Sequence, residues 1–105
     1  MSTALTSREE AIDRIRLLEP QLRTYGVKRL ALFGSFARGN PRFDSDVDLL
    51  VEFAPGHKTF DAFLGVCELL EATLQRRVEL LTFESLSPHL GPQILREAED
   101  VVVSA

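Results

Sequence analysis

Apolar residues recur at two different spacings along the chain, and the changes between them predict helices and strands in turn. The first run follows helical spacing after a capping-box pattern at Ser7–Glu10, so it predicts a helix from about Arg8 to Leu18. Proline is tolerated in a first helical turn but not in a helix interior, so Pro20 predicts a kink or the start of a short second helix. Gly26 is the expected end of this helical region.

Three shorter apolar runs have the length and character of strands. We expect strands at Val27–Phe33, Leu49–Phe53 and Val78–Thr82. The second run is apolar except for Glu52, which is typical of a central strand that is covered on both faces. The pattern predicts an α/β (α+β) chain, with a small mixed sheet and helices mainly on one of its faces.

Two more helices are expected in the second half of the chain. A 3.6-residue period after Thr59 predicts a long helix. Leu90–Ala98 predicts a last short helix, with Ile94 and Leu95 directed inward. Val101–Val103 would either cover the core or contact another chain, because three exposed valines favour association. The apolar stripe of the long helix is expected to consist of Phe60, Phe63, Leu64, Cys67, Leu70 and Leu74.

Composition narrows the classes of function. With 105 residues, 45% of them hydrophobic and 27% charged, the chain fits one small domain, 1–105, with a core. A net charge of −4 argues against direct polynucleotide binding. No apolar run approaches the roughly 20 residues of a membrane span, and the N-terminus lacks a signal-peptide pattern. The single cysteine, Cys67, allows no internal disulfide, which suits a cytoplasmic location.

The end of the first predicted strand carries a Gly-Ser turn that suits a phosphate. Gly34 lets the backbone approach a ligand closely, and Ser35 adds a hydroxyl donor. A helical turn over Ser35–Arg38 would direct backbone N–H groups at the same point. Arg38 either holds a phosphate or pairs with a carboxylate that braces the loop. Arg42 is a weaker nucleotide-binding candidate, because a solvated side chain is the simpler interpretation.

An acidic pair opens the second predicted strand. Asp46 and Asp48 are two residues apart, so a strand would place them on one face, roughly 6–7 Å apart along the backbone. Two carboxylates held this close repel each other unless a cation lies between them. Mg²⁺ prefers oxygen ligands and leaves room for substrate phosphates. Asp44 precedes the strand and is the weaker ligand candidate, because an acid there more often caps a turn.

Glu79 is the unusual residue of the third predicted strand. It is an acid between apolar neighbours, in a strand that we expect near the middle of the sheet. Burying a carboxylate without a partner or a metal ion is costly. Glu79 is therefore a third candidate for the site.

Two stretches together resemble the signature of the DNA polymerase β-like nucleotidyltransferase superfamily. They are Gly34–Gly39, which reads GSFARG, and Ser45–Leu49, which reads SDVDL. The short chain is most similar to the smallest members, the minimal nucleotidyltransferases (MNT), which usually serve as antitoxins beside HEPN-domain toxins. The resemblance covers about Ile12 to Val103, and the two-part motif is far more specific than an acidic pair alone.

This resemblance implies an enzyme that transfers AMP from ATP to a hydroxyl group. Asp46 and Asp48 would hold two Mg²⁺ ions, while Gly34 and Ser35 would hold the β- and γ-phosphates. In the superfamily a third carboxylate, usually Asp, lies on the strand where this chain has Glu79. The longer side chain could complete a metal site and act as the base, or it could point to solvent from an exposed strand face.

The resemblance also implies a protein as acceptor. Larger relatives carry an added domain that binds the acceptor, and this chain has no room for one, so we expect a partner to present it. By resemblance, the acceptor is a tyrosine hydroxyl of a cognate HEPN ribonuclease toxin, which the modification silences. Two alternatives stay open. The chain could neutralise a toxin by occlusion with a vestigial nucleotide site, or a homodimer could form a pocket for a small molecule such as an aminoglycoside.

Overall fold

The computed structural model describes residues 5–42 and 44–103. Within these ranges no helix combines the length and the apolar character that are needed to cross a membrane. The short helix α3 (Gly34–Arg38) follows directly on the first strand, as the sequence predicts.

Four strands form one mixed sheet, in the order β3-β2-β1-β4. β1 (Val27–Phe33) pairs antiparallel with both β2 (Val47–Phe53) and β4 (Glu99–Val103). β3 (Val78–Thr82) runs parallel to β2. The acidic pair therefore lies at the start of β2, which has a strand on each side, β3 and β1.

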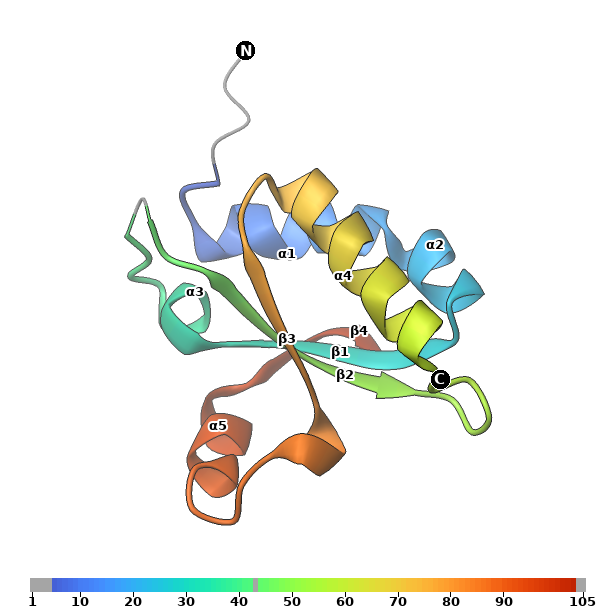
Figure 1. The fold of residues 1–105 in the computed structure, drawn as a ribbon. Coiled ribbons are helices and arrows are strands. Elements are labelled where there is room, and N and C mark those ends of the chain that lie inside the picture. Colours follow the sequence, from blue (N-terminus) through green and yellow to red (C-terminus); the bar gives the residue numbers. More distant parts are fainter. Residues whose placement is uncertain (1–4, 43, 104–105) are drawn as a thin grey trace.

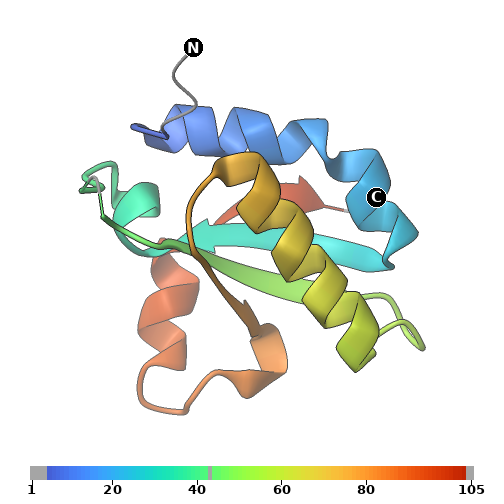
Figure 2. The ribbon, with the colours of Figure 1, turned by 45° about the horizontal axis from the view of Figure 1, so that its top comes forward.

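Helices cover the two faces of the sheet unequally (Figure 1). α1 (Arg8–Leu17), α2 (Glu19–Thr24) and α4 (Phe60–Leu74) form a layer on one face, which Figure 2 shows from a second direction. α5 (Gly91–Glu97) and the short 3-10 helix η1 (Phe83–Ser85) lie on the other face. The predicted mixed sheet with helices mainly on one face is confirmed.

The two faces have cores of different size. Leu32 of β1 and Leu49 of β2 are buried in the larger core, together with apolar residues of α1, α2 and α4. Ala31 and Leu50, their neighbours in sequence, are buried in a smaller core against which Ile94 of α5 packs. Because β1 and β2 contribute buried residues to both cores, they are the central strands of the sheet.

Local sequence signals set the helix ends. Ser7 caps α1 by accepting a hydrogen bond from the amide of Glu10, and Thr59 caps α4 in the same way. Pro20 lies in the first turn of α2, where its missing N–H removes no helical hydrogen bond. Gly26 has a φ of +86° and follows the end of α2. These are local effects, so sequence reasoning predicts them well.

The predicted apolar stripe of α4 is partly wrong. Val66, Leu70 and Leu74 are fully buried, whereas Phe60 is 77% exposed and Leu64 is 44% exposed. At 3.6 residues per turn, the two exposed residues lie about 80–120° around the helix from Leu70. The row through Val66, Leu70 and Leu74 faces the sheet, and the other side of the apolar stripe lies outside the contact surface.

Three expectations for the C-terminal half also need correction. β3 is an edge strand rather than a central one, because the last segment pairs with β1 on the far side of the sheet. Leu95 is 48% exposed, while its neighbour Ile94 packs inward. Val101 and Val102 are buried in a strand that the sequence did not predict, and Val103 is 54% exposed. Val101 and Val102 therefore cover the core.

Candidate functional site

Adjacent strands bring the predicted site residues to one end of the sheet. Asp48 on β2 is the register partner of Glu79 on β3. On its other side Asp48 is the register partner of Phe33, the residue that precedes Gly34. The Gly-Ser turn, the acidic pair and Glu79 therefore lie next to one another, although 45 positions separate Gly34 from Glu79 in the sequence.

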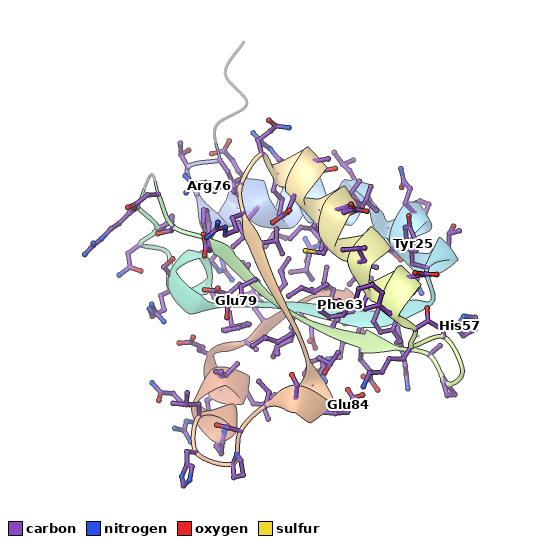
Figure 3. All side chains as sticks on the ribbon, in the orientation of Figure 1. Tyr25, His57, Phe63, Arg76, Glu79 and Glu84 are labelled. Carbon is purple, nitrogen blue, oxygen red and sulfur yellow. The ribbon has the colours of Figure 1, made fainter. Side chains whose placement is uncertain are left out.

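Strand alternation sets the face on which these carboxylates lie. Val47 and Leu49, which flank Asp48, are buried in the larger core, and so are both residues that flank Glu79. Side chains of a strand alternate between faces, so Asp48 and Glu79 project from the face that carries α5. Figure 3 labels Glu79 on β3, at the end of the sheet where α3 lies.

Asp48 carries the electrostatic cost of this arrangement. The pKa of its half-buried carboxyl is raised from 3.8 to about 6, first by desolvation and then by the charge of Glu79, a hydrogen bond with Glu79 and the charge of Asp46. Arg38 acts in the opposite direction and lowers this pKa. A hydrogen bond between two carboxyl groups requires a proton on one of them. Burial and the neighbouring acids thus disfavour the ionised form of Asp48.

Asp46 lies beside this pair but does not complete a cluster with it. It precedes β2 by one residue, is half-buried, and acts on Asp48 through its charge. Among the residues that the structure describes, no three His, Cys, Asp or Glu side chains are grouped closely enough to hold a metal ion. Joint binding of a cation by Asp46, Asp48 and Glu79 therefore requires their side chains to rotate.

Gly34 occupies a position that requires glycine. Its φ of +77° is in the left-handed region, and a Cβ here would overlap Oδ2 of Asp48. The turn backbone therefore lies directly against the carboxylate. α3 has only five residues, so phosphate binding would depend on individual donors more than on a helix dipole. The Ser35 hydroxyl makes no hydrogen bond within the described residues and is available as one such donor.

Arg38 is paired with Glu97 at the C-terminal end of α5. Its Nη1 lies 3.3 Å from Oε1 and 3.1 Å from Oε2 of the Glu97 carboxylate. The amide of Gly34 donates a hydrogen bond to the same Oε1 at 2.9 Å. Of the two interpretations of Arg38, the structure shows the bracing ion pair. Its Nε and Nη2 make no hydrogen bond to other described residues.

Sequence reasoning missed Arg76 as well as Glu97. Its guanidinium donates to the carbonyl oxygens of Arg42 at 2.9 Å, Ser45 at 2.8 Å and Leu5 at 2.6 Å. It also lies 5.1 Å from the centre of the Phe36 ring. Figure 3 labels Arg76 where the chain enters β3. These contacts fasten the loop that leads into β2 to the N-terminal segment.

The side chain of Arg42 does not join the site in this way. Arg42 contributes its backbone to the contacts with Arg76, while its exposed guanidinium makes no hydrogen bond or ion pair within residues 5–42 and 44–103. Asp44 is exposed as well, in keeping with its weaker candidacy as a ligand.

No local pattern marks Glu97 or Arg76, since each is one charged residue among several in its part of the sequence.

A surface cavity of about 370 Å³ lies away from this chemistry. It is lined by Arg23 of α2 and by residues at the start of β1 and in the loop after β2, including Lys28 and His57. Figure 3 shows His57 at the opposite end of the sheet from Glu79. None of the predicted site residues lines this cavity, so the carboxylates and the Gly-Ser turn, rather than the hollow, locate the site.

Comparison with protein families identifies the class of this site. Residues 14–101 match the family model described as the nucleotidyltransferase domain. The chain belongs to the nucleotidyltransferase domain family. The match includes the Gly-Ser turn, the acidic pair and Glu79. The family resemblance of the GSFARG and SDVDL stretches is therefore confirmed.

Two relatives are similar along most of the chain. A candidate protein adenylyltransferase of Methanocaldococcus jannaschii is 42% identical over 87 residues, which are 83% of this chain and 92% of the relative. Protein adenylyltransferase MntA of Thermococcus cleftensis is 36% identical over 95 residues, which are 90% of this chain and 95% of the relative. The similarity thus extends over most of the chain, and this nucleotidyltransferase is an enzyme.

Two solved structures share the fold. A candidate minimal nucleotidyltransferase is 36% identical with a TM-score of 0.68, and the match covers 84% of this chain and 93% of that one. A chain of the complex between a tri-AMPylated Shewanella oneidensis HEPN toxin and an MNT antitoxin is 20% identical with a TM-score of 0.62. That match covers 92% of this chain and 73% of the other. At this low identity, it shows the common fold alone.

Proposed function

We propose that this nucleotidyltransferase is a Mg²⁺-dependent protein adenylyltransferase and acts as an antitoxin. It would transfer AMP from ATP to a hydroxyl group, that of a tyrosine, on a HEPN-domain toxin. The observation that carries the proposal is the position of Asp48, between the Gly34 turn on one side and Glu79 on the other. This places candidate phosphate donors and candidate metal ligands at one point.

The donors of the Gly-Ser turn would bind the triphosphate. The Ser35 hydroxyl and the free Nε and Nη2 of Arg38 would contact the β- and γ-phosphates, and Gly34 would let the backbone approach them. Arg42 could reach the triphosphate from the loop, because its guanidinium is exposed and not committed within the described residues. It has the weakest support of the four.

The carboxylates suit Mg²⁺ by their chemistry. Asp46, Asp48 and Glu79 supply the hard oxygen ligands that Mg²⁺ prefers, and after burial the charges of Glu79 and Asp46 add to the raised pKa of Asp48. We propose that the three together hold two ions. Bound Mg²⁺ would supply positive charge to the attacking and leaving oxygens of the transfer.

The chemical step is a displacement at the α-phosphorus. The acceptor oxygen forms a bond to this phosphorus, and the bond from it to the bridging oxygen of pyrophosphate breaks. The proton of the acceptor hydroxyl passes to a carboxylate oxygen of Glu79, which is exposed on the edge strand. The products are AMP-modified acceptor and pyrophosphate, so no oxidant or further reactant is needed.

A protein acceptor agrees with the relatives of this chain. Two of them are named as protein adenylyltransferases, and the fold occurs in a complex of an MNT antitoxin with an AMPylated HEPN toxin. A partner would present the acceptor to the site that the described residues build. Glu79 on an edge strand leaves this side of the site accessible to such a partner.

The proposal is tested with purified protein, Mg²⁺ and α-labelled ATP, with a HEPN-domain protein as acceptor. We expect label on the acceptor with the wild-type chain and none with Asp46→Asn or Asp48→Asn. Asp44→Asn is the matched control and should retain transfer, because Asp44 is exposed and precedes β2.

Neutralisation by binding alone is the second candidate. It is favoured by the absence of a ready-formed group of three metal-ligating side chains in the described residues. An occluding antitoxin would still form a tight complex and protect cells after Asp46→Asn and Asp48→Asn. Protection by both variants without any labelled acceptor would establish this function and overturn the transferase.

A further inference from the structure

Glu97 reaches the nucleotide site from the end of α5, 63 residues away from Gly34 in the sequence. Its carboxylate accepts a hydrogen bond from the amide of Gly34 and forms an ion pair with Nη1 of Arg38. These two groups belong to the turn that would bind the triphosphate. Glu97 therefore either occupies a phosphate position that the substrate must clear, or it holds the turn in its binding conformation.

The geometry of Arg38 favours the second interpretation. Both carboxylate oxygens of Glu97 face a single nitrogen, Nη1, so Nε and Nη2 stay available to a ligand. The side chain of Glu97 is 26% exposed, whereas that of Arg38 is 53% exposed. The acid is thus the anchored partner, and the guanidinium is the partner that is open to solvent. Such an ion pair orients a long, flexible side chain before a ligand arrives.

The geometry of Gly34 leads to the same conclusion. Its left-handed backbone leaves no room for a Cβ on the side of Asp48, while its amide is held by Glu97. The turn is therefore fixed between one carboxylate of the metal-binding group and a second carboxylate on α5. Loss of Glu97 would release both the amide of Gly34 and the guanidinium of Arg38.

We propose that Glu97 is a positioning residue, which holds the Gly34 amide and the Arg38 guanidinium for the β- and γ-phosphates and stays in place when a triphosphate binds. This inference rests on the proposed function, because it assumes that the triphosphate binds at the Gly-Ser turn. It assigns to α5 a part in substrate binding that acts through Gly34 and Arg38.

The test compares nucleotides that differ only in the distal phosphates. Calorimetry measures the Kd of α,β-methylene-ATP and of AMP for the wild-type chain, Glu97→Ala and Glu97→Gln. We expect Glu97→Ala to raise the Kd of the triphosphate about tenfold and to leave that of AMP unchanged. Glu97→Gln keeps an acceptor for the Gly34 amide but loses the charge toward Arg38, so its effect should be intermediate.

Glu99→Gln is the matched control. Glu99 is also a partly exposed acid in the same region, but it pairs with Arg8, away from the turn. It should bind both nucleotides as the wild-type chain does. If Glu97→Ala fails to fold, Glu97→Gln is instead compared in the wild-type chain and in an Arg38→Gln background. The part of its effect on the Kd of the triphosphate that acts through Arg38 must disappear in that background.

Three outcomes would overturn the inference. Tighter triphosphate binding by Glu97→Ala would show that Glu97 competes with phosphate, and equal losses for AMP and triphosphate would show a general structural effect. Unchanged triphosphate binding by both variants, with a wild-type chain that binds and transfers, would refute the role of Glu97 alone. A wild-type chain that binds no triphosphate would instead contradict the proposed function.

Discussion

The Gly-Ser turn with Arg38 and the group of three carboxylates form two halves of the site. They differ in how far other residues of the protein offset their charges and satisfy their hydrogen bonds. In the phosphate half, the Gly34 amide and one nitrogen of Arg38 already have a carboxylate partner in Glu97. In the carboxylate half, Asp48 lies beside two other acids, and its pKa is raised to about 6 because burial and these charges disfavour ionisation. One half is fixed before a ligand binds, and in the other the charge of Arg38 offsets the rise in the pKa of Asp48 only in part.

This difference indicates where a ligand would change the molecule most. A triphosphate at the Gly-Ser turn would meet donors that are held in position, so little ordering is needed on binding. A cation at the carboxylates would instead relieve repulsion and displace the proton of Asp48. Metal binding at the carboxylates should therefore stabilise the fold.

The largest effect is expected from removal of one charge in the carboxylate half. Asp48→Asn should lower the rate of transfer by about 100-fold or more, because the variant loses a ligand between the turn and Glu79. Initial rates with α-labelled ATP measure this loss. Equal rates for Asp48→Asn and the wild-type chain would show that the acidic pair does not serve the chemistry.

Gly34→Ala tests the contact between the two halves. The left-handed backbone costs an alanine about 1–2 kcal/mol, and its Cβ would also overlap the carboxylate of Asp48. We expect a lower free energy of unfolding in urea and a strong loss of transfer. Gly39→Ala is a suitable comparison, because its φ is also positive, at +81°, but a Cβ there meets no atom within 4 Å. Similar losses of transfer in both variants would argue against the contact with Asp48.

A smaller effect is expected from the loop that leads into β2. Arg76→Lys should lower transfer about tenfold, because a lysine ammonium lacks the planar fork that reaches the carbonyl oxygens of Arg42, Ser45 and Leu5. The Mg²⁺ concentration for half-maximal rate should rise, since the loop positions Asp46. Arg77→Lys is the control, because the exposed neighbour uses only its backbone carbonyl, toward Val47. A normal Mg²⁺ dependence in Arg76→Lys would refute the positioning role.

The smallest effect is a pH-dependent difference in stability between the wild-type chain and Asp48→Asn, without metal. Folding raises the pKa of Asp48 from 3.8 to about 6, so the folded state binds more protons than the unfolded state within that window. The contribution of Asp48 is therefore most favourable below pH 3.8 and is lost as the pH rises through 6.

Thermal unfolding across this pH range measures the difference. The Tm of Asp48→Asn relative to the wild-type chain should increase between pH 4 and pH 6 and then level off. Excess Mg²⁺ at neutral pH should raise the Tm of the wild-type chain and reduce the difference. A Tm difference that does not vary with pH would show that Asp48 is not electrostatically strained.

Sequence reasoning predicted the parts of the site that depend on neighbours along the chain. The bounds of β1 and β3 agree with prediction, and the Gly34 turn and the Asp46–Asp48 pair lie where their motifs place them. Strand periodicity and turn chemistry act over a few residues, so a single sequence contains the necessary information.

The remaining features depend on contacts between distant segments. Glu97 meets Gly34 across 63 positions, and Arg76 meets Leu5 across 71. The edge position of β3 follows from the pairing of β4 with β1, which no local pattern announces. The exposure of Phe60 likewise depends on which side of α4 meets the sheet. These outcomes are set by packing, and single-sequence periodicity does not encode them.

The most direct test of the account follows the position of the label in ATP. The wild-type chain, Mg²⁺ and the HEPN-like partner are incubated with ATP labelled at either the α- or the γ-phosphorus. Displacement at the α-phosphorus predicts label on the partner from α-labelled ATP only, with the γ-label recovered in pyrophosphate. Label on the partner from γ-labelled ATP, or from neither, would contradict nucleotidyl transfer at this site.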